Sequence, residues 1–217
     1  MKSKKCRLLI CIAIVIIVSL VIVKEEVKTD IDACRIQESI AQNIIRFHVR
    51  ANSDSDSDQQ LKLKVKNEVT ALLQPMLTNS DSVEQSRNII AQHMQDIKDT
   101  ALDTIHNEGY SYDVDVYFEK SYFPMKSYAD VTFPPGEYEA FRIDIGDAEG
   151  RNWWCVLYPP LCFVDAVYGE LPKESKEQLK NVLTDDEYNA ITKVRYKYRF
   201  KYLTFLNGLF PVSFRSQ

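Results

Sequence analysis

The chain has 217 residues, 45% of them hydrophobic, and a formal net charge of −4 at pH 7. This length and composition suit one globular domain with a short appendage. Four of the 27 basic residues and none of the 31 acidic residues lie in the first 23 positions, so the rest of the chain carries 23 minus 31, or −8. Such an acidic balance argues against a nucleic-acid-binding protein, and no nucleic-acid partner is predicted.

The N-terminus has the pattern of a segment that directs export. Basic residues precede an apolar run over residues 8–23 that only Ser19 interrupts. At 1.5 Å per residue the run spans roughly 24 Å, slightly short of a ~30 Å hydrocarbon core. Residues 1–23 are therefore predicted to be a signal peptide or signal anchor that leaves residues 24–217 outside the cytoplasm. Small residues at cleavage spacing are missing after Val23, which favours an uncleaved anchor and a juxtamembrane linker over residues 24–43.

A strand with one buried side is expected next, over residues 44–50. The apolar side chains of Ile45, Phe47 and Val49 alternate with basic residues and a histidine. Alternation with a period of two places the apolar side chains on one face of a sheet.

The turn after this strand carries alternate aspartates. Asp54, Asp56 and Asp58 have the spacing that begins a calcium-binding loop. Gln59 occupies the place of the glycine that such a loop needs, and Val65 the place of its bidentate glutamate. We therefore interpret the aspartates as helix caps and predict no metal site.

Two amphipathic helices follow in the prediction. The first covers residues 59–74 and ends near Pro75, because proline disrupts a helix interior. The second covers residues 82–107 with a single apolar stripe, and Asp81 with Glu84 is the expected capping pair at its start.

Three further strands complete the predicted sheet. Residues 110–118 alternate strictly between polar and apolar side chains. Residues 138–146 and 152–158 are separated by a short acidic loop and predict a hairpin, which we expect to be the core on which the rest packs. Residues 120–136 predict a long aromatic loop with a short strand at 128–133, and ordered loops of this length are often functional.

These elements predict an α+β fold: an N-terminal membrane anchor or signal segment, then a mixed β-sheet with the two longer helices on one face. Single apolar stripes on the helices and alternation in the strands are typical of helices that cover one side of a sheet. A conserved-type domain is expected over residues 44–165, followed by a polar helical segment and a C-terminal basic and aromatic strand over residues 166–217.

The segment after residue 165 is predicted in less detail. A short charged helix is expected to begin near Leu171, and another near Thr184, which forms a capping pair with Glu187. Basic and aromatic residues then alternate over residues 194–202. We interpret this stretch as a sheet-edge strand whose charges discourage aggregation. The alternative is a docking face for lipid head groups or an acidic partner.

Two of the five cysteines, Cys155 and Cys162, lie in the predicted exported domain. An oxidising exterior would allow a disulfide between them across the Pro159–Pro160 turn. The alternative is two buried thiols that act as small hydrophobic side chains. The sequence leaves both readings open.

No set of catalytic residues is evident in the sequence. It has no phosphate-cradling glycine pattern, no nucleophile elbow and no HExxH pattern. Cys155 with His48 could form a nucleophile and base, but a cysteine on a tryptophan-flanked apolar strand is more often structural. We therefore expect no catalytic, cofactor-binding or metal-binding residues, and no enzyme.

Three separated motifs, in one order over roughly residues 44–165, resemble the stage II sporulation protein R family. The first is Ile45-Arg46-Phe47-His48-Val49 with Ala51-Asn52-Ser53-Asp54-Ser55. The second is Tyr122-Phe123-Pro124 with Pro135-Gly136-Glu137-Tyr138-Glu139-Ala140. The third is Asn152-Trp153-Trp154-Cys155-Val156-Leu157 with Pro159-Pro160-Leu161-Cys162-Phe163.

The resemblance implies a signal made in the forespore of an endospore-forming bacterium and exported into the intermembrane space. Proteins of this family activate a membrane-embedded aspartic protease in the opposing mother-cell membrane. That protease removes the pro-segment of the sigma factor E precursor. The expected partners are therefore this protease and, through the N-terminal segment, the membrane; no cofactor is implied.

Two stretches are predicted to form the surface that meets the partner. One is the loop from Tyr122 to Tyr128 and the other is the turn from Asn52 to Asp54, beside His48. The residues singled out are His48, Asn52, Asp54, Phe123 and Tyr128. The alternative is that the aromatic rings of the loop fold inward over the strand that contains Trp153 and Trp154.

Two other functions compete with the signalling reading. One is an exported hydrolase that acts on cell-wall material and uses Asp54, His48 or Cys155. The other is a passive structural protein of the intermembrane space.

Overall fold

The computed structural model describes residues 18, 19, 24, 32–78, 80–162, 170–193, 196, 197, 213 and 214. They fall into two compact units, one of residues 1–36 with 193–217 and one of residues 37–192. The larger unit has the predicted α+β architecture with a mixed sheet. In the smaller unit β7 (Tyr196–Lys197) pairs antiparallel with β8 (Ser213–Phe214).

Most of the predicted anchor over residues 1–23 lies outside the described residues, as does most of the predicted strand over residues 194–202. Within the described part of the chain, no helix is both long and apolar enough to cross a bilayer. A helix over residues 32–42 precedes the sheet.

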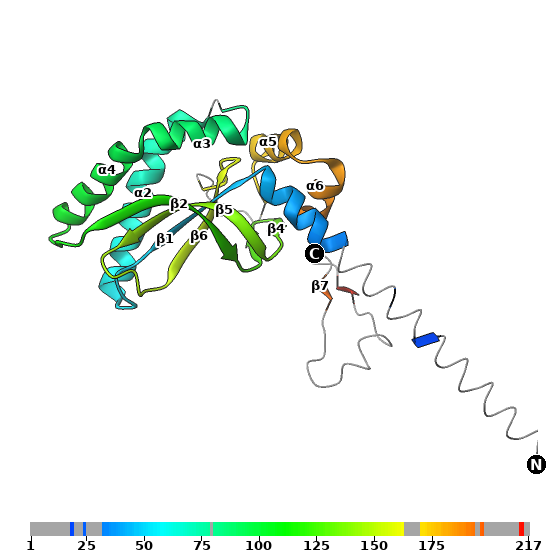
Figure 1. Ribbon diagram of the computed structural model, residues 1–217, viewed down its shortest axis with the longest axis horizontal. Helices are drawn as coiled ribbons and strands as arrows, with labels where there is room; N and C mark the ends of the chain where they lie inside the picture. Colours follow the sequence, from blue (N-terminus) through cyan, green and yellow to red (C-terminus); the bar gives the residue numbers. More distant parts are fainter. Residues whose placement is uncertain are drawn as a thin grey trace, which may run out of the picture. The chain divides into compact units, whose positions relative to one another are not determined.

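The sheet has four strands in the order β2-β5-β1-β6 (Figure 1). Strand β1 (Ile45–Arg50) runs parallel to β5 (Gly136–Ile145) and antiparallel to β6 (Asn152–Tyr158). Strand β2 (Val114–Phe123) runs antiparallel to β5 along its whole length. The four strands are those predicted, but β2 begins and ends later in the chain than the predicted strand over residues 110–118.

The predicted hairpin of β5 and β6 is wrong. The two strands do not pair; β1 lies between them and hydrogen-bonds to both. Neighbouring strands are about 4.8 Å apart, so the connection must step across roughly 10 Å. Residues 146–151 are enough to do so, and pairing with both neighbours gives β1 a central position in the sheet.

Three helices cover one face of the sheet (Figure 1): α2 (Asp56–Leu77), α3 (Val83–Gln92) and α4 (Met94–Asn107). The second predicted helix is thus two helices, which meet at His93, whose backbone is not helical. The first continues through Pro75, because Leu77 is 1% exposed and its burial holds the last turn in place.

The caps at the starts of α2 and α3 differ from those predicted. The Ser55 hydroxyl, rather than an aspartate, accepts from the backbone N–H of Asp58 at the start of α2. At the start of α3 the Ser82 hydroxyl accepts from the N–H of Gln85. The short polar side chain directly before the first helical turn is better placed than the carboxylates around it.

The C-terminal part of the larger unit holds two short helices, α5 (Lys173–Val182) and α6 (Asp185–Thr192). The predicted capping pair of Thr184 with Glu187 is confirmed, since each side chain accepts a hydrogen bond from the other residue's backbone N–H.

The predicted long loop over residues 120–136 is mostly strand: β2 extends to Phe123, and β3 (Lys126–Tyr128) forms a hairpin with β4 (Val131–Phe133).

The core lies between the sheet and the three helices. Alternate residues of each strand point into it, and they include Ile45, Phe47 and Val49 of β1, all fully buried. The apolar stripes of α2, α3 and α4 pack against these strand residues. The core residues from the helices are Leu61, Val65, Val69, Leu73, Leu77, Val83, Ile90, Ile97, Ala101 and Ile105.

The connection between β5 and β6 is fastened to the turn after β1. The N–H of Gly150 donates to the Ala51 carbonyl at 2.9 Å, and the N–H of Glu149 donates to the Asn52 carbonyl at 3.1 Å. A Cβ atom on Gly150 would overlap the backbone carbonyls of Ser53 and Ala51. Only glycine allows this close approach of two backbone segments.

Gly150→Ala is expected to lower the free energy of unfolding by about 2 kcal/mol or more, because backbone atoms cannot move aside as a flexible side chain can. Gly109→Ala is the control: Gly109 has a φ of +84° but open space around its Cβ position, so backbone strain alone, about 1 kcal/mol, is expected there. Urea unfolding of the full chain measures both. Equal losses in the two variants would contradict the steric argument.

Candidate functional site

The face of the sheet that the helices leave uncovered carries an unusual set of polar groups. The alternation that points Ile45, Phe47 and Val49 into the core points Arg46 and His48 to the opposite side. Arg46 is 0% exposed and His48 is 1% exposed. Basic side chains are rarely buried to this extent without a partner, so their surroundings need an explanation.

Arg46 lies in a box of aromatic rings. Its guanidinium carbon is 4.5 Å from the ring centre of Phe123, 5.1 Å from Tyr138, 5.3 Å from Phe133 and 5.7 Å from Tyr128. Its Nη2 donates to the Tyr128 hydroxyl at 3.4 Å, whereas Nε and Nη1 have no hydrogen-bond partner among the described residues. The negative faces of the rings stabilise the cation in place of a carboxylate.

Burial lowers the pKa of Arg46 from its usual range, while the nearby hydroxyls of Tyr128 and Tyr138 act in the opposite direction. Desolvation of a cation is costly, and a few cation–π contacts, each about 1 to 2 kcal/mol when desolvated, offset it only in part. The buried Arg46 therefore lowers the free energy of unfolding relative to an apolar side chain of the same size.

Arg46→Met is expected to leave the free energy of unfolding within about 1 kcal/mol of the wild-type value, or to raise it, because a neutral side chain of similar length has no charge to desolvate. Arg46→Ala is the matched variant and should lower it by about 2 to 4 kcal/mol, because it leaves a cavity among the rings. Urea unfolding measures both. A Met variant as unstable as the Ala variant would mean that the contacts of the guanidinium with the rings outweigh its desolvation cost.

His48 is the second buried polar group on this face. Its ring stacks on Trp154 with 5.2 Å between centres and meets the edge of Phe123 at 5.4 Å. Its Nε2 lies 3.4 Å from Oε1 of Glu119, and neither ring nitrogen makes a hydrogen bond within the described residues. Burial and the Arg142 cation lower the pKa of His48 to about 4, against the opposing effect of Glu119 and Asp144.

Beside His48 the same face carries a network of charged groups that reaches the surface. The Arg142 guanidinium donates to Asp144 at 2.7 Å and to Glu119 at 2.8 Å. Tyr117 donates its hydroxyl to Asp144 at 2.9 Å, and burial together with this bond raises the pKa of Tyr117 to about 12. Arg142 is therefore fully neutralised, and the network is a stable charged rim around the aromatic cluster.

The neutral state of His48 makes the fold sensitive to acid. The pKa is about 6.5 in the unfolded chain and about 4 in the folded one, so between these values the unfolded state binds more protons. The free energy of unfolding should therefore be unaffected by His48 above pH 6.5 and fall by about 3 kcal/mol in total as the pH is lowered from about 6.5 to about 4.

Urea unfolding at a series of pH values measures this dependence. Carboxylates titrate in the same range, so the informative quantity is the difference between the wild type and His48→Phe, which should lose this part of the slope. His106→Phe, at an exposed position, should keep it. Identical slopes in all three proteins would show that His48 is not buried in the neutral form.

The structure corrects the predicted partner surface at two residues. His48 and Phe123 are buried and cannot form an exposed surface, and Phe123 packs edge-on to Trp154 at 4.7 Å. Tyr128 is half-buried over Arg46. Phe123 thus folds inward over β6, as the alternative interpretation described, whereas Tyr122 is 63% exposed and does not. The alternating pattern of β1 placed His48 on a polar face, but the rings of Phe123 and Trp154 that cover it follow only from the tertiary structure.

The turn from Asn52 to Asp54 is partly exposed to solvent, but its side chains have a structural role. The Asn52 side chain accepts from the N–H of Asp147 at 2.9 Å and donates to Asp58 at 3.0 Å. Asp54 accepts from the N–H of Arg151 at 2.7 Å. These side chains hold the β5–β6 connection against the start of α2, so a role in partner binding stays a prediction.

A disulfide joins Cys155 and Cys162 in the structure. Cys155 belongs to the core on the helix-covered side of the sheet, and the disulfide closes the chain around the Pro159–Pro160 turn. Among the described residues no group of three or more His, Cys, Asp or Glu side chains could hold a metal ion.

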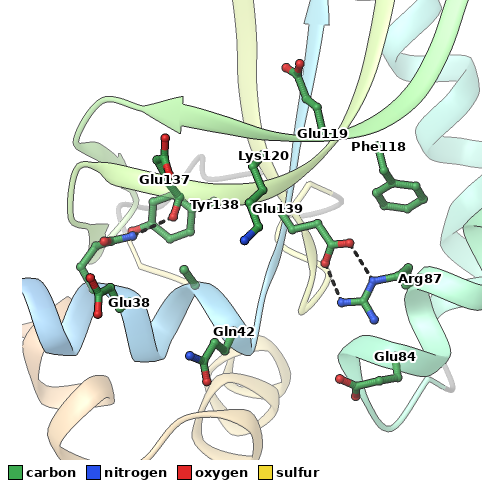
Figure 2. Close-up of a pocket in the computed structure, with 12 residues that line it drawn as sticks. Glu38, Gln42, Glu84, Arg87, Phe118, Glu119, Lys120, Glu137, Tyr138 and Glu139 are labelled. Atoms are coloured by element: carbon green, nitrogen blue, oxygen red, sulfur yellow. Dashed lines mark hydrogen bonds and ion pairs between the residues drawn. The ribbon is translucent and has the colours of Figure 1, made fainter.

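A hollow of about 870 Å³ lies where the start of α3, the helix residues 37–42 and strands β2 and β5 meet (Figure 2). Acidic side chains dominate its lining, with Arg87 and Lys120 as the basic ones. Arg87 binds Glu139 through two hydrogen bonds of 2.6 and 2.7 Å, which tie α3 to β5. Figure 2 shows this pair inside the hollow and the Glu119 side chain pointing away from it. The hollow has the size of a ligand pocket but no assembled catalytic group.

Fold and site together define a class: an α+β domain with one helix-covered sheet face and a second face of buried aromatic, basic and histidine side chains inside a charged rim. Comparison with known proteins gives the family. The sequence model of the family described as stage II sporulation protein R matches residues 41–168. The protein named stage II sporulation protein R from Bacillus subtilis (strain 168) is 38% identical over 152 residues, which cover 67% of this chain and 68% of that protein.

The chain belongs to the stage II sporulation protein R family. Membership supports a role in sporulation, and the family's description names no enzymatic activity. No solved structure gives a significant match to the chain.

Proposed function

We propose that this protein is an exported intercellular signal of sporulation that activates a membrane-embedded aspartic protease. The protease then removes the pro-segment of the sigma factor E precursor in the mother cell. The observation that carries the proposal is the family match, which spans residues 41–168 and so covers the sheet, its helix layer and the buried second face.

The described structure suits a protein that works by binding. Its most unusual side chains are used for packing: Arg46 lies inside the aromatic box and His48 is stacked beneath Trp154. Because these side chains are buried, a partner would contact the exposed residues of the domain, and a surface already formed in the free protein reduces the entropy lost on binding.

The competing interpretation, an exported hydrolase, requires Cys155, His48 or Asp54 to act in catalysis, and their positions do not favour this. Cys155 lies on the helix-covered face in a disulfide, so its sulfur is not available as a thiolate. His48 lies on the opposite face and is neutral down to about pH 4. Asp54 bonds the backbone of Arg151 in the turn beyond β1. A nucleophile and its base must lie within hydrogen-bond reach of each other, and these groups do not form such a pair.

Localisation to the intermembrane space belongs to the same proposal. It rests on the sequence of residues 1–23, whose basic start and apolar run predict export, and on what the resemblance to the family implies about the compartment.

Co-expression in a host that does not sporulate tests the proposal. The full chain, the protease and the sigma factor E precursor are expressed together and in every pair, and processing of the precursor is followed on immunoblots. Processing is expected only when all three are present. A chain that lacks residues 2–23, checked for equal abundance, should fail to activate because it stays in the cytoplasm.

Processing without this chain, or no processing with all three components correctly localised, contradicts the proposal. Activation by the truncated chain from the cytoplasm contradicts the export part alone. His48→Phe, which keeps the ring stack and removes any base, should activate as well as the wild type if binding is the mechanism. Loss of activation in that variant with an unchanged melting temperature would favour the hydrolase.

A further inference from the structure

The helix-covered face of the sheet changes from apolar to polar along β2 and β5. Phe118 of β2 packs against the apolar core on this face. Two positions further along β2, Lys120 stands opposite Glu139. Two positions beyond that, Tyr122 stands opposite Glu137 and is 63% exposed. Alternate residues of a strand share one face, so these two pairs continue the face on which Phe118 lies.

The hollow of about 870 Å³ lies over this polar stretch, between two walls that are fixed to the sheet (Figure 2). One wall is the start of α3, where Arg87 donates two hydrogen bonds of 2.6 and 2.7 Å to Glu139 of β5. The other wall is the helix that precedes β1, where the Gln37 side chain donates to the Glu137 carbonyl at 3.0 Å. A site whose walls are held in place in the free protein loses little conformational entropy when it is filled.

The charge of the larger unit favours a cationic occupant. Residues 37–192 contain 14 Lys and Arg and 27 Asp and Glu, so this unit carries 14 minus 27, or −13. The count includes every such residue of the unit, whether or not it is paired. The smaller unit carries 13 minus 4, or +9, so the acidity of the chain belongs to the unit that forms the hollow. A net charge of −13 attracts cationic partners and repels acidic proteins and anionic lipid surfaces.

Five carboxylates line the hollow, and two of them are paired with cations. Glu139 accepts both hydrogen bonds from Arg87. Glu119 accepts one from Arg142 at 2.8 Å, and its side chain points away from the hollow (Figure 2). A third carboxylate, Glu38, has an interaction of its own and is not counted. The charge that an occupant meets therefore comes from the other two.

These two carboxylates are Glu84 of α3 and Glu137 of β5, and both are exposed. The bonds from Glu139 and, to a smaller extent, the charge of Glu84 raise the pKa of Arg87, so Glu84 is partly engaged within the wall. Lys120, opposite Glu139 in the ladder, opposes a cationic occupant. Because the two carboxylates belong to different elements, a chain with several cations suits them better than a single small amine.

Aromatic rings lie beside these carboxylates. Phe118 is half-buried and lines the hollow, and the exposed ring of Tyr122 stands opposite Glu137 in the ladder. A guanidinium can stack on a ring and pair with a carboxylate at the same time, whereas an ammonium is a compact point charge. The combination of rings and carboxylates therefore favours arginine over lysine.

We propose that the hollow is a docking site for a basic, arginine-containing segment of another protein. The charge of the unit selects cations, carboxylates on two elements select a segment with several of them, and the rings select arginine. The proposal goes beyond the function proposed above and does not depend on the identity of the protease as a partner.

The test uses the purified full chain without any protease, so its failure and that of the proposed function are distinguishable. The probe is a fluorescein-labelled octapeptide of alternating arginine and alanine, compared with peptides that carry lysine or glutamate in place of arginine. Fluorescence anisotropy measures binding. The arginine peptide should bind about two- to fivefold more tightly than the lysine peptide and at least about tenfold more tightly than the glutamate peptide. A photo-reactive group on the arginine peptide should cross-link to residues of α3, β2 or β5 that line the hollow.

Neutralising substitutions supply the matched variants. Glu84→Gln together with Glu137→Gln should weaken binding about three- to tenfold, because two attractions are lost. Asp99→Asn together with Asp103→Asn changes the net charge equally at exposed positions of α4 that do not line the hollow, and should change binding by less than about twofold. Lys120→Gln should strengthen binding about two- to fivefold, a gain that a damaged fold would not produce. Melting temperatures of all variants should stay near the wild-type value.

The proposal is overturned if the arginine peptide does not bind, or if it binds no better than the lysine or the glutamate peptide. Equal weakening by the two double variants also overturns it, because the attraction would then come from the net charge alone. Cross-links outside the hollow contradict the location. A dimer in sedimentation that the arginine peptide dissociates would show that the occupant is a second copy of this chain.

Discussion

The central position of β1 is the constraint on which the rest of the structure depends. This strand hydrogen-bonds to β5 on one side and β6 on the other, so residues Arg46 to Arg50 are fixed along both edges. Because side chains alternate across a sheet, fixing β1 also fixes which residues face the helices and which face away. A shift of one residue in register would place Arg46 and His48 in the apolar core and expose Phe47 to the other side.

The uncovered face follows from this register. On this face aromatic rings cover the buried cation of Arg46 and the buried imidazole of His48. The rings are Phe123 from β2, Tyr128 and Phe133 from the β3–β4 hairpin, and Tyr138 from β5. Such an arrangement is less stable than a wholly apolar core, because the rings and the single hydroxyl contact of Arg46 offset only part of the desolvation cost.

The same topology covers both faces of the sheet. Helices cover one face, aromatic rings cover the other around Arg46 and His48, and the turn closed by the Cys155–Cys162 disulfide covers the end of the β6 edge at Val156.

Much of the fold could be predicted from the sequence. The period-two alternation of β1 and β2 and the single apolar stripes of the helices determine their type and their buried faces, because burial of apolar side chains is a local pattern with a fixed period. The motifs around Ile45, Phe123 and Trp154 likewise identified the family.

Only the tertiary structure decided how the strands are paired and what each polar residue contacts. The short connection of residues 146–151 suggested a hairpin, yet β1, about ninety positions earlier in the chain, lies between the two strands. His48 and Phe123 were expected at the surface, and both are buried because segments distant in sequence meet over them. Long-range pairing and cover depend on which surfaces fit together in three dimensions, and residue spacing along the chain carries little information about that.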